Sequence, residues 1–276
     1  MKPARFDYVR PKTLADAIVA LATAQGTAVA IAGGQSLLPL LSLRMVPADI
    51  LVDIGRLDEL KATDNSRDCV RIGAGLTHAA IEDRRVADPS GGLMRKVASG
   101  IAYRAVRNYG TIGGSVALAD PAADWPVCLI ALGAIARFQG PAGERTETVA
   151  SLAHGAYSTS LQQAEIITAF DVPRFATPLR WGYAKVMRKS GAFAMAIGCV
   201  VRPAGAKPTA VLGGTTTQPR LLPRLAERLG EAVKPSEEHL RTVIAADLAS
   251  VAPDADAYQQ RLYTATLLRA AREAFA

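Results

Sequence analysis

The chain has 276 residues, half of them hydrophobic, and a formal net charge of +7. This length and apolar fraction exclude a disordered chain and allow one large domain or two ordinary ones. The basic charge raises the question of nucleic-acid binding, but the lysines and arginines are scattered, without a basic run. We therefore disfavour nucleic acid and expect a basic surface that helps hold an anionic cofactor or an acidic partner subunit.

The first half of the chain is expected to alternate short strands and helices. Thr13 caps a helix whose apolar residues fall at helical spacing, and Gly26 ends it. Thr77 caps a second helix. Strands are predicted over 6–9, 28–32, 50–54 and 69–75, and helices over 14–25, 77–82 and, more weakly, 91–102.

The second half changes from mixed elements to strands and then to helices. A helix over 124–132 is followed by strands over 134–138 and 165–172. The stretch from Pro173 to Pro178 is predicted to be a linker and the domain boundary. Beyond it, strands over 180–188, 193–201 and 208–212 are expected to form one antiparallel sheet, followed by helices over 219–230, 236–252 and 256–276. This order indicates an α+β fold and not a regular doubly wound sheet.

The cysteines and histidines are too dispersed for a metal centre. Cys69, Cys128 and Cys199 show no paired spacing, and the three histidines are equally separated, so we predict no disulfide framework, no iron–sulfur ligand set and no bound metal. Free thiols suit a reducing cytoplasm. The N-terminus lacks the pattern of a signal peptide, and the longest apolar stretch, 191–201, is too short to span a bilayer.

Two glycine-rich loops carry the chemistry: AGGQS over 32–36 and TIGGS over 111–115. Glycine allows positive φ and lets backbone N–H groups approach an anion, so two such loops could face one pyrophosphate from both sides, with added hydroxyl donors. Neither loop contains Lys or Arg, and neither matches the GxGxxG pattern of a dinucleotide-binding βαβ unit. Either loop alone is more often an ordinary turn, as we expect for a third glycine pair at Gly213-Gly214.

Several other polar residues are interpreted as structural. Asp53, Asp58 and Glu59 are expected to be solvated charges at a strand end, and His78 a surface residue in the first turn of a helix. Ser36 has no partners for a triad, so no catalytic residue is predicted. Arg104 and Arg107 could contact phosphate or a partner, or form salt bridges; the sequence leaves these alternatives open. The C-terminal helix suggests core or subunit contact, not a membrane anchor.

Five segments occur together in the order typical of one family. They read FDYVRPKTLADAI, IAGGQSLLPLL, VRNYGTIGGSVALADPAADWP, EIITAFDVP and YAKVMRKSGAFAMA. With them the chain resembles, over nearly its whole length, the FAD-binding medium subunit of the molybdenum hydroxylases, the group of carbon monoxide dehydrogenase and the flavin domain of xanthine dehydrogenase. The resemblance implies a two-subdomain FAD-binding fold of the vanillyl-alcohol-oxidase (PCMH-like) type over 1–176, with subdomains of about 1–55 and 56–176. A C-terminal α+β domain with a three-stranded antiparallel sheet and helices would follow over 177–276.

The resemblance also implies the cofactor-binding residues. The two loops would hold the FAD pyrophosphate, Asp124 would contact the cofactor, Ile167 would lie beside the flavin, and Lys185 would lie near the flavin edge. The complete set is Ile31, Ala32, Gly33, Gly34, Gln35, Ser36, Thr111, Ile112, Gly113, Gly114, Ser115, Asp124, Ile167 and Lys185. Two positions depart from the family pattern: Leu118 stands where relatives often have His, and Ala192 where they usually have an acidic residue. Both departures bear on flavin tuning and not on the phosphate loops.

The implied function is electron transfer within a larger complex. Iron–sulfur clusters, two of the 2Fe-2S type, would lie on a small subunit and the molybdenum cofactor on a large one, in a (large-medium-small)₂ assembly. This chain would accept electrons on FAD and pass them to an external acceptor. Two alternatives stay open: a stand-alone FAD oxidoreductase, and a non-catalytic scaffold that has lost FAD. The sequence names neither the organic substrate nor the acceptor.

Overall fold

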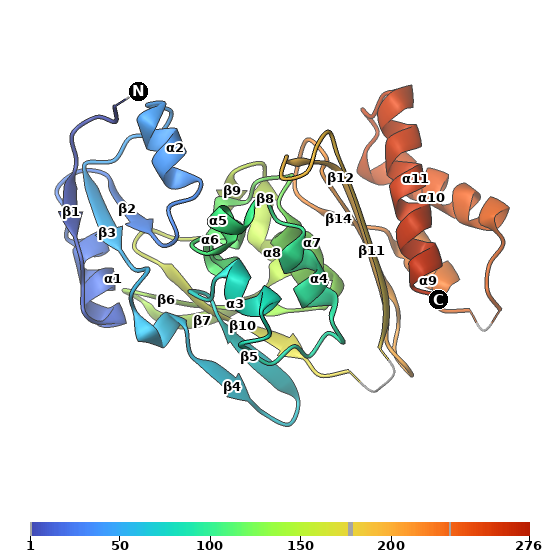
Figure 1. The fold of residues 1–276 in the computed structure, drawn as a ribbon, viewed down its shortest axis with the longest axis horizontal. Coiled ribbons are helices and arrows are strands. Elements are labelled where there is room, and N and C mark those ends of the chain that lie inside the picture. The colour runs from blue at the N-terminus through green and yellow to red at the C-terminus, as the bar shows by residue number, and fades with distance from the viewer. Residues whose placement is uncertain (1, 176–178, 232) are drawn as a thin grey trace.

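The computed structural model describes residues 2–175, 179–231 and 233–276, and its elements lie in three groups along the longest axis (Figure 1). The N-terminal group is a parallel sheet in the order β1-β3-β2, with α1 and α2 beside it. Its elements are β1 (Asp7–Val9), α1 (Leu14–Ala22), β2 (Ala28–Ile31), α2 (Leu37–Ser42) and β3 (Ile50–Asp53).

Helix α1 confirms the predicted cap and apolar face. The Thr13 side chain accepts a hydrogen bond from the backbone N–H of Asp16, which satisfies one of the free donors of the first turn. The residues at helical spacing are the buried ones: Leu14, Ala17, Ile18 and Leu21. They pack with Val52 of β3, so the amphipathic pattern fixes how the helix lies on its sheet.

The middle group is an antiparallel sheet in the order β4-β5-β10-β6-β7, with helices packed on one face. Trp125, Phe138 and Phe170 are among the largest fully buried side chains of this core. The strands β4, β7, β8 and β9 were not predicted from the sequence. The elements are η1 (Asp58–Leu60), β4 (Thr63–Asn65), β5 (Cys69–Gly73), α3 (His78–Glu82), α4 (Leu93–Ser99), α5 (Arg104–Arg107), α6 (Ile112–Leu118), α7 (Asp124–Ala131), β6 (Ile135–Gly140), β7 (Gly143–Thr148), α8 (Val149–Leu152), β8 (Ala153–Gly155), β9 (Ser158–Thr159) and β10 (Ile166–Pro173).

The C-terminal group is an antiparallel sheet of four strands and not three, in the order β11-β12-β13-β14. The extra strand arises because Arg220 and Leu221 pair with Leu212 and Val211 before the next helix begins, where the sequence had predicted helix from 219. Its elements are β11 (Arg180–Met187), β12 (Ala194–Arg202), β13 (Thr209–Gly213), β14 (Arg220–Leu221), α9 (Pro223–Leu229), α10 (Glu237–Val251) and α11 (Ala257–Glu273).

The C-terminal sheet is covered on both faces. Residues of α9, α10 and α11 form a core with one face of it, and residues of α7 in the middle group pack on β12 and β13. Close approach to α11 requires Gly182, where a Cβ would lie 1.8 Å from the carbonyl oxygen of Ala270. The predicted boundary residues 176–178 lie outside the described part of the chain.

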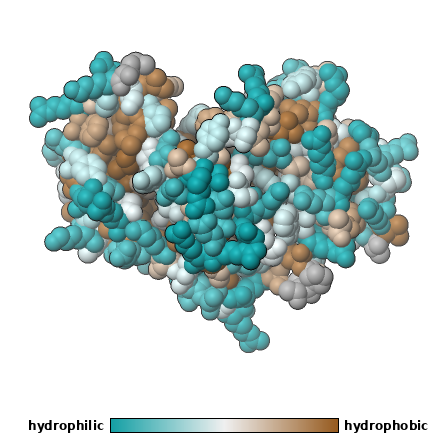
Figure 2. Space-filling model, in the orientation of Figure 1, coloured by the Kyte–Doolittle hydropathy of each residue, from teal (hydrophilic) through white to brown (hydrophobic). Residues whose placement is uncertain are grey.

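The surface polarity differs between the groups (Figure 2). Apolar side chains gather over the N-terminal group, where Leu38, Leu43 and Met45 in and after α2 are exposed. In the described residues, no helix combines the length and apolar character needed to cross a bilayer.

Candidate cofactor site

The first glycine loop lies against the residues that immediately precede the second, although the two are far apart in the sequence. The first loop follows β2, and the second contains the start of α6. A Cβ on Gly33 would lie 2.0 Å from the carbonyl oxygen of Tyr109 and 2.9 Å from the Cα of Gly110. No side chain fits between them, so glycine at position 33 is what brings the first loop against the residues that precede Thr111.

The first loop offers a run of free backbone donors. From Ala32 to Ser36, no backbone N–H group has a hydrogen-bond acceptor among the described residues. The chain bends there through Gly34, whose φ is +68°, and into a right-handed conformation at Ser36. Successive N–H groups in such a bend form a concave anion-binding surface, so this loop fits a diphosphate without any cationic side chain.

The second loop is different, because most of its backbone amides already donate to acceptors within the protein. The N–H groups of Ile112 and Gly113 donate to the carbonyl oxygens of Leu76 and Ala74, at 3.0 and 2.8 Å. Gly114 N–H donates to Thr111 Oγ1 at 3.0 Å. The amides of Ile112, Gly113 and Gly114 are therefore not free to meet an anion in this conformation, whereas the Thr111 N–H has no acceptor among the described residues. The loop presents an exposed Gly114 and the Ser115 hydroxyl, which has no partner among the described residues.

Asp124 and Lys185 form a buried ion pair between α7 and β11. Lys185 Nζ donates to Asp124 Oδ2 at 2.8 Å and to the carbonyl oxygen of Gly100 at 3.3 Å. The Tyr183 hydroxyl donates to the other carboxylate oxygen of Asp124. The side chains of Asp124 and Lys185 are only 6% and 7% exposed. Burial raises the pKa of Asp124, and the Lys185 ammonium opposes that rise.

These site residues form two separate groups by their direct contacts. The first loop contacts Tyr109 and Gly110, just before the second, and Asp124 contacts Lys185, but no hydrogen bond of the described residues joins one group to the other. Ile167 is 5% exposed in the helix-covered core, beside an irregularity in the β10–β6 ladder. Ile31 is the last residue of β2 and packs in a small hydrophobic cluster with Leu41 and Leu51.

Residues 4–175 match the family model described as the FAD binding domain in molybdopterin dehydrogenase. The chain belongs to this family. It is 36% identical over 201 residues to the nicotine 6-hydroxylase medium subunit of Paenarthrobacter nicotinovorans, covering 73% of this chain and 70% of the relative. The carbon monoxide dehydrogenase medium chain of Hydrogenophaga pseudoflava is also 36% identical over 201 residues, with the same coverage of each chain.

Solved structures extend the match to the whole length of this FAD-family chain. A chain of the H. pseudoflava carbon monoxide dehydrogenase that lacks the Mo-pyranopterin moiety superposes with a TM-score of 0.92, at 30% identity, covering 100% of this chain and 99% of that one. Quinoline 2-oxidoreductase from Pseudomonas putida 86 gives a TM-score of 0.89 at 29% identity, with the same coverage. The predicted α+β class, with an FAD-binding domain and a C-terminal domain that contains an antiparallel sheet, is confirmed.

His78 was wrongly predicted to be a surface residue. It is 5% exposed, and its Nδ1 accepts a hydrogen bond from Trp125 Nε1 at 3.0 Å. Burial, assisted by the nearby Arg107 cation, lowers the pKa of His78 to about 4, so the ring is neutral at neutral pH. The signal that could have placed it inside is its position three residues before the buried Ile81, on the same face of α3.

Asp53 was also wrongly predicted to be solvated. It is 9% exposed and accepts hydrogen bonds from the Tyr8 hydroxyl, from Arg10 Nε at 3.0 Å and from Gly55 N–H at 2.9 Å. Glu59 accepts from the backbone N–H of Leu14 at 3.0 Å and so ties η1 to the start of α1. The side chain of Asp58, by contrast, is 99% exposed.

Arg104 and Arg107 form salt bridges, which resolves the alternatives left by the sequence. Arg107 Nε lies 2.8 Å from Glu82, and Arg104 contacts both Glu82 and Asp83 at 2.8 and 2.7 Å. These pairs hold α5 on α3 and thereby support the segment that leads into the second glycine loop. Both guanidinium groups are thus already paired with carboxylates of the protein, so neither is a free cation for a phosphate.

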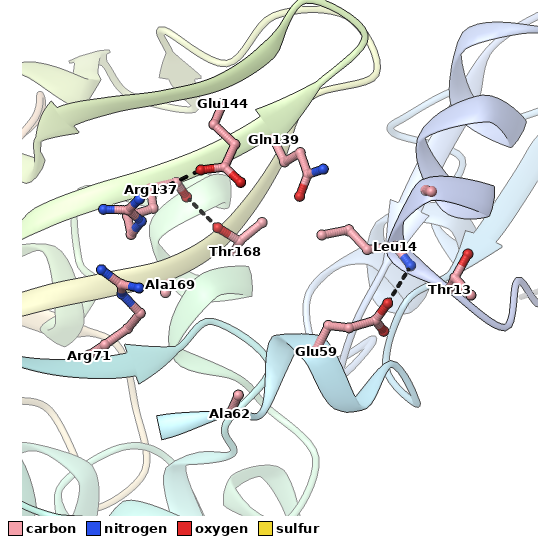
Figure 3. A pocket seen from close by; sticks show the side chains of 11 residues that line it. Thr13, Leu14, Glu59, Ala62, Arg71, Arg137, Gln139, Glu144, Thr168 and Ala169 are labelled. Atoms are coloured by element: carbon pink, nitrogen blue, oxygen red, sulfur yellow. Dashed lines mark hydrogen bonds and ion pairs between the residues drawn. The ribbon is translucent and has the colours of Figure 1, made fainter. Parts of the chain in front are cut away.

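A cavity of about 390 Å³ lies away from the glycine loops, between the start of α1 and the outer face of the five-stranded sheet (Figure 3). Arg71 and Arg137 on its wall are both paired with Asp171, at 2.7 and 3.1 Å. Because these charges are already neutralised and no loop residue lines the cavity, we do not assign it to the cofactor. In the described residues, no group of His, Cys, Asp or Glu could hold a metal.

The two departures from the family pattern lie at the end of a helix and in the connection between two strands. Leu118 is the last residue of α6, followed by Ala119 with a φ of +52°. Ala192 lies between β11 and β12, where its N–H donates to the carbonyl oxygen of Lys189, and the following Phe193 is 74% exposed. Neither side chain takes part in the hydrogen bonds that shape the glycine loops.

Proposed function

We propose that this chain is the flavin subunit of a molybdenum-dependent hydroxylase, which accepts electrons from iron–sulfur clusters of a partner onto FAD and passes them to an external acceptor. The observation that carries the proposal is the run of acceptor-free backbone N–H groups over 32–36, held against the segment before Thr111 in a chain of the FAD-binding family. Such a bend binds a diphosphate through dipoles alone.

The residues have distinct roles in this proposal. Residues 32–36 donate backbone hydrogen bonds to the pyrophosphate, and Thr111 and Ser115 line its other side with hydroxyl groups. Asp124, Ile167 and Lys185 serve the flavin end. The full proposed set is Ile31, Ala32, Gly33, Gly34, Gln35, Ser36, Thr111, Ile112, Gly113, Gly114, Ser115, Asp124, Ile167 and Lys185.

Lys185 brings a buried cation whose charge is fixed by Asp124. A positive charge held near a flavin favours added electron density on the ring, and Asp124 determines how much of that charge is left uncompensated. Bound FAD supplies the redox chemistry, while the chain supplies position and electrostatics. We assign no side chain of this protein as a general acid or base.

The assembly and its location are part of the same proposal. Relatives are named as medium chains or medium subunits. We infer a large molybdenum-cofactor subunit and a small subunit with two 2Fe-2S clusters as partners, in a (large-medium-small)₂ complex in the cytoplasm. We also infer an FAD-binding domain over 1–176 and a C-terminal domain over 177–276; the shared core of α7 with β12 and β13 would fix their relative position.

The test is purification of the full chain alone and with its partners. The chain alone should be yellow, should release FAD on denaturation, and should oxidise no organic substrate until both partner subunits are added. A colourless chain that takes up no added FAD would refute the proposal in favour of a scaffold. Turnover of an organic substrate by the chain alone would favour a stand-alone oxidoreductase.

A further inference from the structure

A continuous line of close contacts runs from the first turn of α7 to the first glycine loop. Trp125 Nε1 donates to His78 Nδ1 at 3.0 Å, and the opposite edge of the His78 ring lies against Gly110. A Cβ on Gly110 would be 2.7 Å from His78 Nε2 and 2.9 Å from its Cδ2. Gly110 in turn touches Gly33, so a shift of the imidazole is transmitted to the junction of the loops.

The hydrogen bond from Trp125 also fixes the tautomer of His78. An indole N–H can only donate, so Nδ1 must be the unprotonated nitrogen and the proton must be on Nε2. Nε2 has no hydrogen-bond partner among the described residues. It is nevertheless not one of the described polar atoms that lack both a partner and contact with solvent. The ring is thus held in one orientation by Trp125, with its free N–H edge turned to Gly110.

The same turn of α7 reaches both ends of the cofactor site. Asp124 pairs with Lys185 of β11, and the next residue, Trp125, is fully buried and holds His78. His78 is further tied to the second loop segment through its backbone, because its N–H donates to the carbonyl oxygen of Gly110 at 2.9 Å. A single helical turn therefore sets the geometry of the ion pair and of the loop junction together.

We propose that His78 is a positioning residue for the cofactor: its imidazole, fixed by Trp125, holds Gly110 against Gly33 and so sets the shape of the pyrophosphate site. This rests on the proposed function, because it assumes that the loop junction binds the diphosphate of FAD. The consequence is selective. Loss of the ring edge weakens ligands that carry a diphosphate and leaves ligands that carry only the flavin ring unaffected.

The experiment compares His78→Asn with His154→Asn in the full chain. Asparagine retains an oxygen that can accept from Trp125 but lacks the ring edge against Gly110; His154 is exposed, so its replacement is the matched control. We expect His78→Asn to bind FAD and ADP about tenfold more weakly, the effect of losing one fixed contact, and to bind riboflavin as the wild type does. Unchanged ADP affinity, or equal losses for ADP and riboflavin, would overturn the proposal.

A measurement on the wild-type chain covers the case in which His78→Asn does not fold. ¹⁵N NMR of the histidine rings should show His78 protonated on Nε2 only, and saturating ADP should shift the resonances of this ring and of the Gly110 amide. A proton on Nδ1, or no shift at either site when ADP is bound, contradicts the positioning role while the proposed function stands. If the wild type binds neither ADP nor FAD, both fail.

Discussion

Replacing Gly33 by alanine tests the contact on which the candidate site depends. The new methyl group would lie 2.0 Å from the carbonyl oxygen of Tyr109, so the two backbones must separate by roughly 1.4 Å to reach an ordinary contact. Overpacking of this kind costs about 1–3 kcal/mol. If this overlap drives the two segments apart in the FAD-free variant, FAD binding must bring them back together at the same cost. The affinity for FAD then falls about 5- to 150-fold.

The assay is titration of the full-length Gly33→Ala chain with FAD, followed by flavin fluorescence, beside a thermal melting curve. Gly155→Ala is the matched control, because a Cβ at Gly155 meets no atom within 4 Å and its backbone does not have a positive φ. The control should bind FAD and melt as the wild type does. Equal FAD affinity of Gly33→Ala and Gly155→Ala would refute the view that the loop junction forms the binding site.

Three further changes have predictable effects on stability. Lys185→Met leaves Asp124 buried without its cation and should lower the free energy of unfolding, measured in urea, by about 3–5 kcal/mol. Because the folded pKa of Asp124 is raised, this loss should grow as pH rises above 3.8. A loss that does not change with pH would contradict this. For His78, whose folded pKa is lowered from 6.5 to about 4, its contribution to stability should fall by about 3 kcal/mol as pH falls through that window, and His78→Asn should lack this contribution; equal pH profiles of the two proteins would contradict it. Thr111→Val removes the cap of α6 and should cost about 1 kcal/mol in thermal melting; an unchanged Tm would show that the cap is dispensable.

The local elements were largely predictable because their signals lie within a few residues. The Thr13 and Thr77 caps, and the apolar spacing from Leu14 to Leu21, were read directly from neighbouring side chains and are confirmed. Strand β14 was missed because Arg220 and Leu221 are strand only through pairing with β13. The edge strands β4 and β7 were missed for a related reason: their exposed residues show little apolar alternation.

The family and the two glycine loops follow from the order of residues along the chain, since a glycine pair followed by a hydroxyl side chain is a local feature. The sequence does not show which loop has free backbone amides. The N–H groups of Ile112 and Gly113 are bound by the carbonyl oxygens of Leu76 and Ala74, which only folding brings near. The partners of the His78 ring likewise lie far along the chain, at Gly110 and Trp125. Hydrogen-bond satisfaction and desolvation are properties of neighbours in space, so only the folded chain decides them.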